Sequence, residues 1–67
     1  MADSQEEVRR LLSQKEAAAY LGISYWTIRD LIFRGEIPVV PITKRMRLVD
    51  IEDLKAYIER KKRHFGA

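Results

Sequence analysis

The chain has 67 residues with no cysteine and one histidine, and its 13 basic and 10 acidic side chains give a net charge of +3. A domain of this size buries only about 60% of the surface that its unfolded chain exposes, which argues against an enclosed active site. The composition also excludes disulfides and a thiolate zinc site, and no apolar run approaches the roughly 20 residues of a membrane span. We therefore expect no metal, no other cofactor and no membrane association.

The basic charge is unevenly distributed along the chain. Residues 17–49 carry five basic side chains against two acidic ones, and the segment RKKRH follows at 60–64. A local basic excess is expected where one face meets a polyanion, and it is equally compatible with a solvated surface. The acidic start, MADSQEEVRR, differs from a signal peptide, so the protein is expected to act inside the cell.

The first element in the chain is predicted to begin only after a flexible N-terminal segment. Residues 1–10 show no clear hydrophobic period, although Val8, Leu11 and Leu12 allow one weak turn of helix. The next stretch, LSQKEAAAYLG, predicts a helix over 14–21. Ser13 is placed as the N-cap and Glu16 as its capping-box partner. The inward face is predicted to be Ala17, Ala18 and Leu21.

A second helix is predicted over 25–34, directly after the first. Only Gly22 and Ile23 separate the first helix from the next N-cap, Ser24, so the two helices must cross through a tight turn. This arrangement is a helix-turn-helix. The buried face of the second helix, at spacing i, i+3 and i+4, consists of Ile28, Leu31 and Ile32. At 100° per residue, the opposite face carries Trp26, Asp30 and Phe33.

After Gly35 the pattern changes from helix to strand. Pro38 and Pro41 exclude a helix and suit edge strands. A hairpin with a turn near 43–45 is predicted, in which Arg45 and Arg47 form a basic face and Met46 and Leu48 an apolar one. Such a cationic hairpin is typical of a DNA-binding wing. Either Leu48 or Val49 is the last inward residue. Asp50 then caps a third helix, whose buried stripe is Ile51, Leu54 and Ile58.

Residues 11–58 resemble the excisionase-type DNA-binding domains, which are relatives of the DNA-binding head of the MerR regulators. The resemblance lies in KEAAAYLGIS, in TIRDLIFRGEIP, in the strand pair with R-M-R, and in DLKAYI. It implies a mainly α fold with a small β-hairpin, a winged helix-turn-helix over 11–63, followed by a short tail at 64–67. It further implies no catalytic activity and sequence-specific binding to double-stranded DNA in the bacterial cytoplasm, on the nucleoid when bound.

Two biological tasks are implied by the resemblance. One is that of a recombination directionality factor of a prophage or mobile element, and the other is that of a small transcription regulator of the prophage-activator kind. The recognition helix over 25–34 is expected in the major groove and the wing over 42–47 on the backbone or in the minor groove. The DNA-binding residues carried over by position are Ser24, Tyr25, Trp26, Arg29, Asp30, Phe33, Thr43, Lys44, Arg45 and Arg47.

The roles of several of these residues remain open at this point. Arg29 is suited to pair with a guanine edge, and Asp30 either holds Arg29 in position or accepts a hydrogen bond from a cytosine amine. Trp26 and Phe33 have three interpretations: contact with thymine methyls or sugars, packing against an integrase or a second copy, or folding back onto neighbouring elements. The alternative function is therefore a protein-interaction module of the same fold, which uses Trp26 and Phe33 to bind an integrase or another partner.

Overall fold

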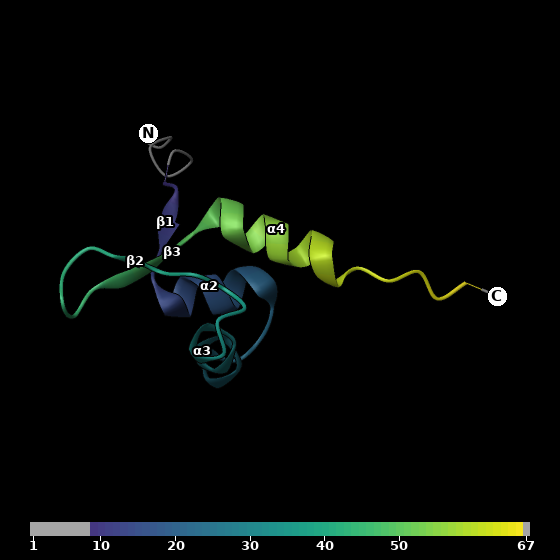
Figure 1. Cartoon of the computed structure of the whole chain (residues 1–67), viewed down its shortest axis with the longest axis horizontal. Helices are drawn as coiled ribbons and strands as arrows, with labels where there is room; N and C mark the ends of the chain where they lie inside the picture. Colours follow the sequence, from purple (N-terminus) through teal and green to yellow (C-terminus); the bar gives the residue numbers. More distant parts are fainter. Residues whose placement is uncertain (1–8, 67) are drawn as a thin grey trace.

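The computed structural model describes residues 9–66 of the chain. Three helices and a small three-stranded antiparallel sheet make up the fold (Figure 1). The predicted winged helix-turn-helix is confirmed, with the wing projecting at one end of the molecule and the C-terminal tail at the other. In chain order the elements are β1 (Leu11–Leu12), α2 (Gln14–Leu21), α3 (Tyr25–Phe33), β2 (Val40–Pro41), β3 (Arg47–Asp50) and α4 (Ile51–Lys61).

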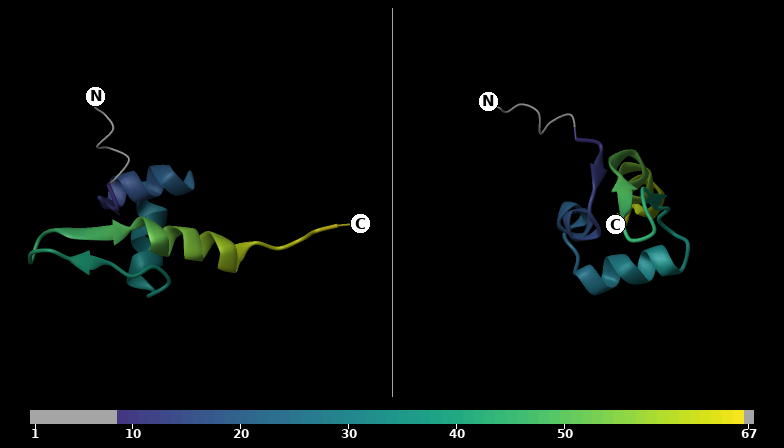
Figure 2. Two further views of the ribbon diagram at one scale, coloured as in Figure 1. Left: turned by 90° about the horizontal axis from the view of Figure 1, so that it is seen from above. Right: turned by 90° about the vertical axis from the view of Figure 1, so that its left-hand side faces the viewer.

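The helix-turn-helix forms through the caps that the sequence predicts. The Ser13 hydroxyl accepts from the Glu16 backbone N–H at 3.0 Å, and the Glu16 carboxylate accepts from the Ser13 N–H at 2.8 Å. This second hydrogen bond is the main reason why the pKa of Glu16 lies below its ordinary value. Gly22 ends α2 with φ of 75°, a left-handed conformation that costs glycine little. The chain therefore turns at once into α3, which crosses α2 at a steep angle (Figure 2).

The core is small and draws on every helix and on the central strand. Ala17 and Ala18 are buried as predicted, and Leu21 is half-buried. Two alanines on the inner face let α3 approach α2 closely. Within residues 9–66, the core consists of seven buried apolar residues: Ala17, Ala18, Ile28, Leu31, Ile37, Val49 and Leu54.

The prediction of a helical turn at Leu11 and Leu12 is wrong. These residues form β1 and pair with β3, with Leu11 opposite Asp50 and Leu12 opposite Val49. Because β2 pairs with the other edge of β3, the sheet has the order β1-β3-β2. The backbone polar groups of β1 are thus satisfied by a strand distant in sequence, which a local helical turn would not achieve.

The segment before β1 is attached to α4 by an ion pair. The Arg10 guanidinium donates to both carboxylate oxygens of Asp50, at 3.0 and 2.9 Å. The Asp50 carboxylate also accepts from the Glu52 backbone N–H and caps α4. These hydrogen bonds, that from Arg10 first, hold the pKa of Asp50 below its ordinary value. Asp50 therefore links the residue before β1 to the first turn of α4.

The inward residue of the wing strand is Val49, which is fully buried, whereas Leu48 is half-buried. The predicted apolar face of Met46 and Leu48 is not buried at Met46, where 49% of the surface is exposed. Met46 lies in the turn of the hairpin, where its N–H and carbonyl bond to Thr43 and Ile42. The wing thus extends beyond the core. The residues at 41–47 are exposed, and burial begins with Leu48 and Val49 of β3.

Candidate nucleic-acid interface

The wing and the start of α3 lie around one surface hollow. This hollow has a volume of about 310 Å³ and also includes the start of α2. Its lining residues are Ser13, Gln14, Lys15, Tyr25, Arg45, Met46, Arg47 and Leu48. The first residue of α3 and two basic residues of the wing therefore share one side of the molecule.

The outward face of α3 is strongly exposed. Trp26 has 72% of its surface exposed and Phe33 has 89%, whereas Ile28 is fully buried and Leu31 is 6% exposed. The predicted orientation of the helix is therefore confirmed. Exposure of this extent excludes the interpretation in which the two rings fold back onto neighbouring elements.

Arg29 lies against two aromatic rings of its own helix. Its guanidinium carbon is 5.7 Å from the centroid of the Tyr25 ring and 5.8 Å from that of the Trp26 ring. The rings meet edge to face, with centroids 5.7 Å apart. Each cation–π contact of an exposed arginine stabilises its conformation by about 0.5–1 kcal/mol. Arg29 is thus held on the outer face of the first turns of α3.

Asp30 does not pair with Arg29, so the prediction that it holds this guanidinium is wrong. Its carboxylate forms an ion pair with Arg34, one helical turn further along, with 3.0 Å between Oδ2 and Nε. The i, i+4 spacing places these two side chains on the same side of the helix, whereas adjacent residues diverge. Within residues 9–66, Arg29 therefore has no carboxylate partner, and its donors remain available for a ligand.

The wing carries three cations that make no ion pair within residues 9–66: Lys44, Arg45 and Arg47. Thr43 stabilises the turn that carries Lys44 and Arg45. Its hydroxyl accepts from the backbone N–H groups of Arg45, at 3.2 Å, and Met46, at 3.0 Å. Thr43 thus has a structural role that its predicted place among the DNA contacts did not include.

Ser24 likewise serves the fold first. Its hydroxyl accepts from the Thr27 backbone N–H at 3.1 Å and lies 2.9 Å from the Thr27 hydroxyl. The cap fixes the point at which α3 begins and thereby the direction in which Tyr25 and Trp26 leave the helix.

Two residues at the start of α2 belong to the hollow but were not predicted as site residues. Gln14 and Lys15 line it beside Arg45 and Arg47. The capping box at Ser13 predicts where α2 begins. That the wing lies beside this end of α2 is visible only in the folded structure. Gln14 supplies an amide and Lys15 a cation to the same side as the wing.

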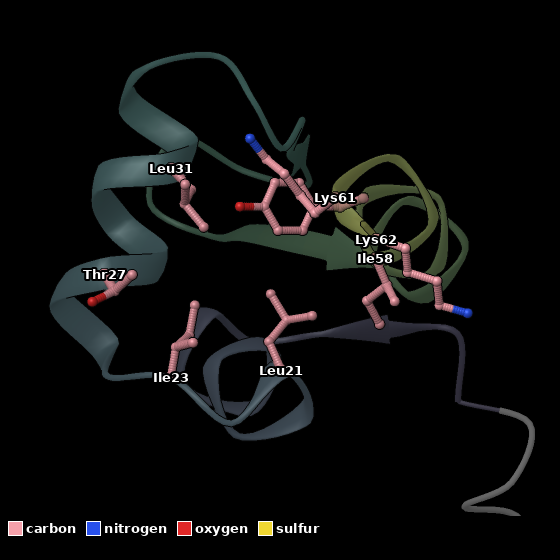
Figure 3. Close-up of a pocket in the computed structure, with 8 residues that line it drawn as sticks. Leu21, Ile23, Thr27, Leu31, Ile58, Lys61 and Lys62 are labelled. Carbon is pink, nitrogen blue, oxygen red and sulfur yellow. The ribbon is translucent and has the colours of Figure 1, made fainter. Parts of the chain in front are cut away.

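A second hollow, of about 340 Å³, lies between the α2–α3 turn and the C-terminal half of α4 (Figure 3). Leu21, Ile23 and Leu31 face it from one side, and Ile58 faces it from α4. Its polar groups come from Thr27, Tyr57, Lys61 and Lys62. The lining is therefore mainly apolar, with its two cations and its phenol supplied by α4 and the residue that follows it.

Two further observations concern the described part of the chain. Among residues 9–66, no three His, Asp or Glu side chains lie close enough together to hold a metal ion. None of the helices described is both long enough and apolar enough to cross a membrane.

A family model described as a helix-turn-helix domain matches residues 11–62. The chain belongs to this family. The match extends from β1 to the end of α4 and confirms the excisionase-type resemblance. Members of the family are DNA-binding domains rather than enzymes, and this helix-turn-helix protein is accordingly a DNA-binding one. A search of characterised proteins gave no match.

Proposed function

We propose that this helix-turn-helix domain reads a specific DNA sequence, with α3 in the major groove and the wing over 42–47 on the backbone or in the minor groove. The observation that carries the proposal is the hollow that brings Tyr25 of α3 next to Arg45 and Arg47 of the wing. With a helix and a basic hairpin on one side of the molecule, the helix can contact base edges in the groove while the hairpin contacts the phosphates.

The charge pattern supports the division between the two elements. The unpaired cations of the wing suit phosphates, because they need no rearrangement of an existing ion pair before binding. On α3, Arg29 presents a planar fork of donors that matches the O6 and N7 acceptors of guanine. The wing thus supplies affinity and the helix supplies sequence discrimination.

The biological task that we propose is that of a recombination directionality factor, or of a small regulator of transcription, in a prophage or mobile element. A domain this small covers few base pairs, so specific binding would use several copies side by side or a partner such as an integrase. Two assays distinguish these tasks. An excision assay with the integrase of the same element measures recombination, and a promoter reporter measures control of transcription.

DNA binding itself is tested by fluorescence anisotropy over a salt series. Replacement of Arg45 and Arg47 by alanine should weaken binding to all duplexes and reduce the slope of log K against log[salt] by about 1.8, because each lost phosphate contact contributes about 0.9. The control replaces Lys55, which pairs with Glu52 on α4 and lies outside the basic segment 60–64. Salt-independent binding, or an equal change of slope in the control, would contradict the proposal.

A second candidate function rests on the exposure of Trp26 and Phe33. Aromatic side chains that are 72% and 89% exposed are typical anchors of protein interfaces. In this function the pair binds an integrase or another protein. Alanine at both positions would then abolish capture of the integrase while DNA affinity stays unchanged, and loss of DNA affinity instead would favour the first function.

A further inference from the structure

We propose that Arg29, Tyr25 and Trp26 form a reader for one dinucleotide feature, a guanine beside a 5-methylpyrimidine in the major groove. Arg29 pairs with the guanine edge, and the Trp26 ring contacts the 5-methyl group of the neighbouring thymine or 5-methylcytosine. This inference rests on the proposed function, because it requires α3 to lie in the major groove.

The guanidinium of Arg29 is held by the two rings of α3. It lies within 6 Å of both ring centroids, and the nearest carboxylate in the sequence, that of Asp30, is engaged by Arg34. An arginine that is held on aromatic rings and free of a carboxylate keeps its donors available in a restricted set of rotamers. Less freedom is lost when two parallel hydrogen bonds form to O6 and N7 of a guanine.

The two rings beside Arg29 differ in exposure. Trp26 is 72% exposed and Tyr25 is 37% exposed, and Tyr25 borders the hollow next to the wing. Trp26 is therefore the more exposed of the two rings beside Arg29. Successive bases in one strand are about 3.4 Å apart, so a ring 5.8 Å from the guanidinium carbon reaches the base pair next to the guanine.

The chemistry of the indole ring favours an apolar group on that neighbouring base. An indole has one N–H donor and no charge, so it gains little from a phosphate. In the major groove the apolar group that a base presents is the C5-methyl of thymine, and 5-methylcytosine carries the same group at the same position. A 5-methylpyrimidine next to the guanine therefore matches the pair of side chains.

The experiment begins with selection of binding sites from random duplexes by the full chain. Four probes then place thymine, uracil, 5-methylcytosine or cytosine next to the guanine of the selected site. Loss of the methyl group, from thymine to uracil or from 5-methylcytosine to cytosine, should weaken wild-type binding about fourfold, which corresponds to the burial of one methyl group. Replacement of that guanine by 7-deazaguanine should weaken wild-type binding at least fivefold.

The variants assign these effects to side chains. Trp26→Ala should bind the methylated and unmethylated probes equally, and Trp26→Phe should recover part of the difference. Arg29→Ala should become insensitive to 7-deazaguanine. Tyr20→Ala is the matched control, because Tyr20 is an exposed aromatic residue of α2, and it should retain both effects. Trp26 is the only tryptophan, so quenching of its fluorescence by DNA reports the contact directly.

Each outcome has one meaning. A methyl effect seen only between thymine and uracil, or only between 5-methylcytosine and cytosine, identifies which of the two methylated bases the protein recognises. An effect in both comparisons shows that the protein recognises the methyl group on either base. Equal binding of wild type to all four probes, or a methyl effect that persists in Trp26→Ala, overturns the inference while the proposed function stands. Failure to select any sequence counts against the proposed function instead.

Discussion

Leu54 is the side chain by which α4 enters the core, and its truncation tests how the fold is held together. Leu54 is fully buried and is one of the seven buried apolar residues that form the core within residues 9–66. Leu54→Ala removes apolar contacts and leaves a cavity, which costs about 2–5 kcal/mol at a buried leucine. A chain of this length has a free energy of unfolding of roughly 3–10 kcal/mol, so this single change removes a large part of it.

Thermal unfolding followed by circular dichroism measures the effect. In a domain of 60–100 residues, each kcal/mol shifts Tm by about 4–8 °C, so a loss of 3 kcal/mol lowers Tm by about 12–24 °C. The control is Met46→Ala on the wing, which should change stability by less than about 0.5 kcal/mol because 49% of Met46 is exposed. A loss below 1 kcal/mol for Leu54→Ala, or an equal loss for Met46→Ala, would refute this account of the core.

Two further changes test the turn and the ion pair. Gly22→Ala should cost about 1–2 kcal/mol in urea unfolding, because Gly22 has φ of 75° and nothing within 4 Å of an added Cβ, so backbone strain alone decides the effect; an unchanged urea midpoint would contradict this. Asp50→Asn retains a capping side chain but loses the Arg10 ion pair, so it should lower stability at pH 7. Because folding lowers the pKa of Asp50, its contribution is present above the unfolded pKa of about 3.9 and is lost as pH falls through the folded pKa. The stabilities of the wild type and this variant should therefore converge as the pH falls below that unfolded value and through the lower folded pKa, and a difference independent of pH would argue against the ion pair.

The features that the sequence predicts correctly are those decided within a few residues. The capping box joins Ser13 and Glu16 across one turn, and the left-handed Gly22 follows from the residue type at a helix end. The exposed face of α3 follows in the same way from the angular positions of Ile28 and Trp26 on one helix.

The features that the sequence did not predict depend on residues far apart. A two-residue strand at Leu11 and Leu12 has no period of its own and exists because β3 offers an unpaired edge. Both Leu48 and Val49 are apolar, so only the helices packed against β3 decide that Val49 faces inward. The Asp30–Arg34 pair is different, because its i, i+4 spacing was present in the sequence and favours this partner over Arg29.

Trp26 and Phe33 are seven residues apart, which places them on the same side of α3 and about 10 Å apart along its axis. Arg29 lies between them on the adjoining part of that face. At exposures of 72% and 89%, the two rings add little to folding, so alanine at either position should leave the free energy of unfolding nearly unchanged. Their effects on binding then separate the two functions. If the face reads DNA, Arg29→Ala and Trp26→Ala weaken the same complex. If it binds a protein, Trp26→Ala and Phe33→Ala act together on that partner, and Arg29→Ala acts alone on DNA.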